Sequence, residues 1–233
     1  MPEAQSVIDF VARCFDTDDY SDLTVKCRER SWKVHRLIVC SQSRFLHAAC
    51  TAGFKEAHTG IIDLDDDDPV PVEVMLKYFY TGKYNEPINE SKDLRLQLQV
   101  QVLTYNLADK YDLPTLMELA AEKFRNTLNE GSTAEEYLSV VRNAYIIPKP
   151  SNALRTIVID YARREFQNIM QSPDLDILRA TLQEEPEFAF DVLQSFVKAP
   201  LRGYCSRCGP NQEAKALQAC CKKCGKGGIS VRN

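Results

Sequence analysis

The sequence predicts an α+β fold, because two kinds of hydrophobic periodicity occupy different parts of the chain. Apolar and polar residues alternate in residues 21–27 and 31–34, which is the period of a strand with one buried face. Between residues 35 and 197, most apolar residues instead recur three and four positions apart, as on one face of a helix. Two cysteine pairs after residue 200 predict a small tail with its own organisation.

The composition is that of a folded chain and excludes several classes of protein. Of 233 residues, 44% are hydrophobic and 27% are charged, which argues against wholesale disorder and allows a core to form. No apolar run approaches the roughly 20 residues of a membrane span, and residues 1–5 lack the features of a secretory signal. We therefore expect an intracellular protein, in the nucleus or the cytoplasm, with no membrane partner.

A helix is expected within residues 1–17, with a hairpin after it. Helical spacing in the first segment relates three apolar residues, Val7, Val11 and Cys14. Period-two alternation in the second segment places three side chains on one strand face, Leu23, Val25 and Cys27. Residues 28–30 are polar enough to form a turn, so residues 31–34 are expected to return as the second strand.

Two short helices and a third strand are expected next. Helical spacing begins after His35, Ser43 is placed to cap a second helix, and Gly53 to end it. Residues 61–64 resemble a short strand. The acidic run 65–68 could suggest a metal site or a surface for a basic partner. It is better explained by Asp68 as the N-cap of a helix that begins with proline and stops at residues 81–82.

These residues, in this order, resemble a BTB/POZ domain. The resemblance is carried by Tyr20–Val25, Trp32–Val39, Ser43–Phe45, Gly53–Glu56, Ile61–Leu64, Asp67–Pro69, Leu76–Tyr84 and Leu107–Pro114. It covers residues 18–128, about half of the chain, and the Gly-Phe-Lys-Glu and acidic-run variants are similar to the fungal branch of the family. It implies a small mixed sheet flanked by helical hairpins.

One segment is ambiguous from periodicity alone. Alternation from Leu94 to Val102 indicates a strand, whereas the spacing of Leu96, Val100 and Leu103 indicates a helix. The family resemblance implies a helix at this place. We therefore expect a helix over about residues 97–111, preceded by a loop over residues 85–91.

Residues 129–200 are expected to form an all-helical extension, at a position where BTB proteins often carry further helices. Thr133 and Glu136 form a capping-box pattern, and Ser132 and Glu135 form a second one. Later helices are expected to begin after Ser151, at Ser172–Pro173 and at Pro186. Each apolar stripe could be a partner-binding groove, but packing against neighbouring helices is the better explanation, including for Ala189, Val192, Leu193, Phe196 and Val197.

Residues 201–233 are expected to form a zinc-ribbon-like knuckle of four cysteines within a basic tail. Two Cys-x2-Cys-Gly motifs, separated by twelve residues, supply the candidate ligands Cys205, Cys208, Cys221 and Cys224. Two intervening residues let one turn direct both thiolates at one ion, and the following glycine lets the backbone curl. Four thiolates leave no open position for water, so we expect a structural Zn²⁺.

Cys220 leaves the third ligand open, because it also forms a Cys-x3-Cys pair with Cys224. We favour Cys221, whose pair copies the spacing of the first pair. Redox-active or disulfide-linked cysteines are the alternatives to zinc. The four scattered cysteines are expected to be small core residues in a reducing compartment, namely Cys14, Cys27, Cys40 and Cys50.

The motifs do not point to catalysis. The sequence has no glycine-rich phosphate loop, nucleophile elbow or His-Glu-x-x-His motif. The family resemblance implies that His35 is a buried, hydrogen-bonded residue and that Asp22 shapes the same core. We expect a non-enzymatic protein–protein interaction module.

The resemblance further implies self-association, or a role as a substrate adaptor for a cullin-3 ubiquitin ligase. In cullin-binding members a hydrophobic-x-Glu motif precedes the third helix of the domain, and Phe54 and Glu56 occupy that place. The apolar residue would fill a partner pocket while the acid orients it. The alternative is that Phe54 packs on its own domain and Glu56 is solvated.

A second hypothesis is a nuclear transcriptional or chromatin regulator whose tail contacts nucleic acid. Residues 198–233 contain eight Lys or Arg residues against one acid, Glu213, and Tyr204 adds an aromatic ring. The whole chain, however, has a net charge of -4, and the tail has little aromatic surface on which bases could stack. Nucleic acid is therefore the weaker expectation.

Overall fold

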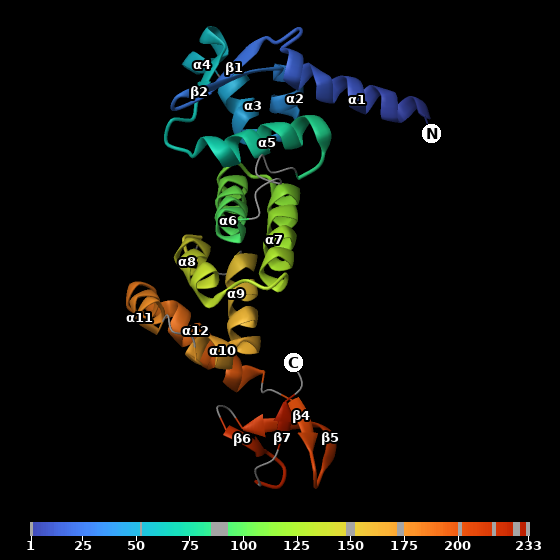
Figure 1. Cartoon of the computed structure of the whole chain (residues 1–233). Helices are drawn as coiled ribbons and strands as arrows, with labels where there is room; N and C mark the ends of the chain where they lie inside the picture. Colours follow the sequence, from blue (N-terminus) through green and yellow to red (C-terminus); the bar gives the residue numbers. More distant parts are fainter. Residues whose placement is uncertain are drawn as a thin grey trace. The chain divides into compact units, whose positions relative to one another are not determined.

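The computed structural model resolves two compact units, Met1–Ser132 and Thr133–Asn233 (Figure 1). The structure describes residues 2–51, 53–84, 93–147, 152–171, 175–199, 202–215, 218–225 and 229–231. Among these residues, every helix is too short or too polar to cross a membrane.

The first unit contains the mixed sheet that the family resemblance implied. Its strands are β1 (Leu23–Cys27), β2 (Arg30–Val34) and β3 (Ile61–Asp63), in the order β2-β1-β3. The central strand β1 pairs antiparallel with β2 and parallel with β3. Leu23, Val25 and Cys27 are at most 2% exposed, so the predicted strand face is confirmed.

Seven helices complete the described part of this unit. They are α1 (Pro2–Thr17), α2 (Arg36–Gln42), α3 (Arg44–Thr51), α4 (Lys55–Thr59), α5 (Pro69–Thr81), α6 (Leu94–Lys110) and α7 (Pro114–Asn129). Helices α2 and α3 pack together, as do α6 and α7. The apolar face of α5 is at most 5% exposed at Val72, Met75, Leu76 and Phe79.

Local signals set the helix ends where the sequence predicted them. Ser43 Oγ accepts a hydrogen bond from the Leu46 amide at 3.4 Å and donates one to the Tyr111 carbonyl at 2.9 Å. Asp68 accepts from the Val70 amide at 2.9 Å, which confirms it as the N-cap of α5. Gly82 ends α5 with a φ of 64°, a conformation that glycine adopts without strain.

The helical interpretation of the ambiguous segment is confirmed, although α6 begins three residues earlier than expected. The Asp93 side chain caps it by accepting from the Leu96 amide at 3.2 Å. The alternation of apolar residues wrongly indicated a strand because α6 is buried on more than one side. Val100 lies on a different side of the helix from Leu98 and Val102, and all three are at most 4% exposed. The expected loop at residues 85–91 lies outside the described residues.

Helix α1 is confirmed, but only part of its apolar face packs. Val11 and Cys14 lie against the core of the unit, and the rings of Phe15 and Tyr80 are 5.1 Å apart. Val7 is 64% exposed, so its expected place on a packed face is wrong. The scattered cysteines do serve as core residues: Cys27 and Cys50 are buried, and Cys14 and Cys40 are half-buried.

The second unit contains the helical extension. Its helices are α8 (Ala134–Ala144), α9 (Ala153–Arg164), α10 (Phe166–Gln171), α11 (Leu175–Glu184) and α12 (Pro186–Lys198). Tyr137 lies at the centre with no exposed surface and donates a hydrogen bond to the Val158 carbonyl at 2.8 Å. Its ring packs 4.7 Å from Tyr161 and 6.5 Å from Phe188, which joins α8, α9 and α12.

Three expectations for this extension need correction. Asn152, and not Ser151, caps α9 by accepting from the Arg155 amide; Ser151 itself and Ser172–Pro173 lie outside the described residues. Helix α10 was not expected as a separate element. On α12, Leu193 is 54% and Val197 is 73% exposed, so their expected packing against neighbouring helices is wrong.

The capping box at the start of α8 yields a stability prediction. Thr133 Oγ1 accepts from the Glu136 amide at 3.2 Å, and Glu136 accepts from the Thr133 amide at 2.7 Å. Thr133→Ala should therefore lower the free energy of unfolding by about 1 kcal/mol, measured by chemical denaturation. Ser132→Ala is the matched control and should cost less, because only the Thr133 box forms.

The tail folds as a four-stranded antiparallel sheet with the order β6-β5-β4-β7. Its strands are β4 (Arg202–Cys205), β5 (Gly209–Lys215), β6 (Gln218–Cys221) and β7 (Ile229–Val231). Tight turns follow β4 and β6, and these turns carry the cysteine pairs.

Candidate functional site

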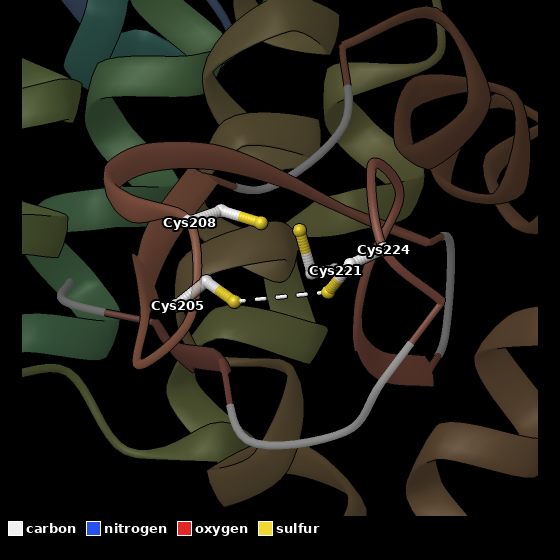
Figure 2. A group of neighbouring side chains, drawn as sticks. All are labelled: Cys205, Cys208, Cys221 and Cys224. Carbon is white, nitrogen blue, oxygen red and sulfur yellow. Dashed lines mark hydrogen bonds between the residues drawn. The ribbon is translucent and has the colours of Figure 1, made fainter.

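The four predicted cysteine ligands meet at one point of the tail. Cys205 and Cys221 end strands β4 and β6, and Cys208 and Cys224 lie in the turns that follow (Figure 2). Figure 2 shows the sulfurs of the two pairs pointing toward one another, and all four lie within 4.8 Å of one another. This arrangement could hold a metal ion.

The spacing of the sulfurs suits a tetrahedral site. With Zn–S bonds of about 2.3 Å, neighbouring sulfurs in a tetrahedron are about 3.8 Å apart. The Cys205 and Cys224 sulfurs are 4.0 Å apart, which is close to that distance and about twice the length of a disulfide bond. The cysteines are free thiols, so the geometry fits an ion better than a disulfide.

The backbone prepares one of these thiols for metal binding. Amide groups of Arg207 and Cys208 donate to the Cys205 sulfur and lower its pKa to about 7. Burial, and then hydrogen bonds that the Cys208 thiol donates to the other cysteines, raise the pKa of Cys208 to about 12. Because the thiolate is the form that binds metal, amide donors at one sulfur favour the first ligand, and a bound cation would favour ionisation of the others.

The turns around the cluster depend on glycine. Gly209 has a φ of 88° and Gly225 a φ of 67°, and each directly follows the second cysteine of a pair. The Gly225 amide donates to the Cys221 carbonyl at 2.7 Å, which closes the second turn. Cys205 and Cys221 are at most 2% exposed, whereas Cys208 and Cys224 are half-buried.

The structure places Cys221 in the cluster, while the side chain of Cys220 lies outside the described residues. Two basic residues near the cluster share one acid, because Glu213 accepts from Arg202 and from Lys222, each at 3.2 Å. The ring of Tyr204 is on the surface of β4, where the residue is 50% exposed.

Phe54 and Glu56 lie at the start of α4 in the first unit. Phe54 is the residue before the helix and is 55% exposed, whereas Glu56 is half-buried in the first turn. Arg36 holds this segment in place, because its guanidinium donates to the Ala57 carbonyl at 3.1 Å and to the Cys50 carbonyl at 3.3 Å. The sequence alone does not indicate this role of Arg36, because no local spacing predicts a contact with residues so far along the chain.

His35 is hydrogen-bonded as the resemblance implied but only half-buried, and Asp22 lies at the surface and not in the core as expected. His35 is half-buried, and its ring nitrogens lie 2.7 Å from the Tyr80 hydroxyl and 2.7 Å from the Asp19 carbonyl. Asp22 is exposed, and its carboxylate accepts from the Arg36 amide at 2.7 Å. Both side chains therefore act at the edge of the sheet, where they hold the turn between β2 and α2.

The acidic run 65–68 has a structural role, as the predicted helix N-cap at Asp68 implied. Asp67 accepts from Lys110 at 2.8 Å and from the Tyr111 hydroxyl at 2.6 Å, which ties the run to the end of α6. Burial, and then this bond to Asp67, raise the pKa of Tyr111, so its hydroxyl remains a donor. Lys110 and Tyr111 therefore account for Asp67, and the N-cap of α5 accounts for Asp68.

Curated relatives of this chain carry BTB domains. Kelch repeat and BTB domain-containing protein 4 from Mus musculus is 25% identical over 119 residues, which are 51% of this chain and 20% of that protein. BTB/POZ domain-containing protein 9 from Homo sapiens is 22% identical over 205 residues, or 87% of this chain and 31% of that protein. This chain spans less than a third of the length of either relative. The second match is long enough to include the helical extension.

A solved structure and a family profile complete the comparison. The BTB domain of zebrafish PATZ1 is 14% identical, and the match covers 53% of this chain and 92% of that chain with a TM-score of 0.42. The profile of the BTB/POZ domain matches residues 11–128. This span includes the mixed sheet and helices α2–α6, and it covers half of the sequence. The chain belongs to the BTB/POZ domain family.

Proposed function

We propose that this chain is a non-enzymatic intracellular adaptor whose BTB domain docks onto a ubiquitin-ligase scaffold of the cullin-3 type. BTB domains mediate protein–protein interaction, and the curated relatives named above carry such domains. The docking residue in this proposal is Phe54, supported by Glu56.

The observation that carries the proposal is the exposure of Phe54. A large apolar side chain that is 55% exposed, at the fixed start of a helix, suits an anchor that fills a partner pocket. Glu56 follows within the first turn, where its carboxylate is near enough to orient the same partner. The exposure counts against the alternative that Phe54 packs on its own domain.

Phe54→Ala should weaken binding of purified cullin-3 at least tenfold, because an apolar anchor contributes about 2 kcal/mol or more when it is buried in a partner. Isothermal titration calorimetry measures this change. Phe10→Ala is the matched control, because Phe10 is 53% exposed on α1 and undergoes the same truncation.

If the Phe54→Ala chain and the parent chain bind cullin-3 with equal affinity, Phe54 is not the docking residue. Thermal melts of both variants check that each still folds. Since both phenylalanines are exposed, neither change should lower the melting temperature.

We also propose that the tail binds one structural Zn²⁺ through Cys205, Cys208, Cys221 and Cys224. The donor set supports it, because four thiolates in Cys-x2-Cys pairs are a typical ligand set of structural zinc sites. When bound, the ion would cross-link the two turns of the sheet.

The second candidate function, a nucleic-acid-binding regulator, has weaker support. Tyr204 and Arg207 are exposed beside the cluster, but Glu213 pairs with Arg202 and Lys222 and reduces the positive field there. This role would require the full chain to shift DNA or RNA in a gel at low salt and to release it as salt rises.

A further inference from the structure

The last helix of the extension is apolar on two faces. Its inner face packs into the unit, with Phe188, Val192 and Phe196 at most 9% exposed. Its outer face carries Phe190, Leu193 and Val197, which are 63%, 54% and 73% exposed. We call these three residues the α12 stripe. Contiguous exposed apolar side chains mark interaction surfaces, so the α12 stripe needs a cover.

The spacing of the α12 stripe suits a second helix. Its members are three and four residues apart, which is the seam along which two helices interlock their side chains. Leu193 also lines an apolar cavity of about 190 Å³ that is enclosed by residues of α8–α12, among them Phe166, Met170 and Leu182. A cavity of roughly 150 Å³ accepts a benzene ring, so the space beside the stripe is large enough for an apolar side chain.

The charges at the ends of α12 identify which helix fits. Glu187 lies in its first turn, where Arg155 binds one carboxylate oxygen at 2.7 Å while the side chain remains 70% exposed. Lys198 is the last residue of the helix. A second α12 that ran antiparallel would place the Lys198 ammonium near the Glu187 carboxylate at both ends. It would also align the two helix dipoles favourably. A parallel copy would place like charges together.

We propose that the α12 stripe is a self-association surface, covered by α12 of a second copy of this chain in antiparallel orientation. Phe190 of each copy then packs against Val197 of the other, and the two Leu193 side chains lie near the two-fold axis. Each copy presents the same patch, as a closed two-fold dimer requires. The interface lies outside the BTB domain and does not depend on the proposed docking to cullin-3.

The direct test places the photo-crosslinker benzoylphenylalanine at position 190 of the full chain. Equal amounts of ¹⁴N- and ¹⁵N-labelled chains are mixed, irradiated and digested, and mass spectrometry identifies peptides that join the two labels. We expect mixed-label crosslinks from position 190 to residues 186–198. Crosslinks confined to one label, or mixed crosslinks that reach only residues 1–132, would overturn the proposal.

A matched pair of variants tests the same surface by sedimentation velocity. Leu193→Asp places two carboxylates at the two-fold axis and should weaken self-association at least tenfold. Ile146→Asp should leave it unchanged, because Ile146 is 60% exposed but lies off the stripe. Equal sedimentation of the Leu193→Asp and parent chains would contradict the proposal, whether or not the BTB domain itself dimerises.

Charge reversal at the other end of the helix tests the orientation. Lys198→Glu should weaken the dimer several-fold, because it would place a carboxylate near Glu187 of the other copy at both ends. Equal self-association of the Lys198→Glu and parent chains would exclude the antiparallel arrangement.

Discussion

Cys221→Ser should release the proposed Zn²⁺ and unfold the tail sheet, whereas Cys220→Ser at the adjacent position should do neither. Cys221 is fully buried in the cluster, and its sulfur lies within 4.8 Å of the other three. A serine hydroxyl is a poor zinc ligand, so the site would lose a quarter of its donors. Structural zinc sites in small domains contribute roughly 10–16 kcal/mol of apparent binding free energy, which is also folding free energy.

The effect should be large because the tail has little else to hold it together. The core cluster found in the described part of the tail consists of Cys205 and Cys221, with Cys208 and Cys224 packed against them. A sheet of this size without an apolar core or a metal is not expected to be stable. Zinc removal by a chelator should therefore unfold the tail of the parent chain as well.

Two measurements check this expectation. Elemental analysis should find about one zinc per chain in the parent and in Cys220→Ser, and much less in Cys221→Ser. Hydrogen exchange should show lost protection over residues 202–225 in Cys221→Ser, with the BTB domain unchanged. A tail that remains protected from exchange without metal would exclude a structural zinc site. Zinc loss in Cys220→Ser but not in Cys221→Ser would show that Cys220, and not Cys221, is the third ligand.

Features of this chain that were predictable from the sequence depend on residues close together along it. The strand face of β1, the caps at Ser43, Asp68 and Thr133, and the cysteine pairs all arise within a few residues. The joining of the two cysteine pairs followed from metal chemistry, because one ion needs four ligands.

Contacts between distant segments could not be predicted in the same way. Arg36 bonds to carbonyls that lie 14 and 21 residues away, and nothing in its local sequence selects those partners. Periodicity also failed on α12, because it counts apolar positions and cannot show which of two apolar faces has a neighbour. Leu193 and Val197 were therefore predicted to pack, although both are exposed.

Arg155→Ala should destabilise the helical extension by about 3 kcal/mol, because it removes one member of a buried polar network. Arg155 is 7% exposed, and its guanidinium donates to Glu187 at 2.7 Å and to the Tyr145 carbonyl at 3.1 Å. It also lies 4.2 Å from the centre of the Tyr145 ring. The network therefore joins the end of α8 to α9 and α12.

The cost arises from the groups that Arg155 would leave behind. The Tyr145 hydroxyl donates to Asp191 at 3.1 Å, and Asp191 is 5% exposed. Burial, and then the charge of Asp191, raise the pKa of Tyr145, while the positive charge of Arg155 opposes that shift. Truncation at residue 155 would leave the buried Tyr145 carbonyl without this donor and Glu187 without its ion-pair partner.

Chemical denaturation of the full chain measures this loss, with Arg179→Ala as the matched control. Arg179 also pairs with an acid, Asp176, at 3.2 Å, but its side chain is 74% exposed, so its truncation should cost less than about 1 kcal/mol. Arg155→Lys should fall between the two, because lysine keeps the charge but cannot stack and bond through a planar fork. If Arg155→Ala costs no more than Arg179→Ala, the apolar contacts around Tyr137 hold α8, α9 and α12 together without the polar network.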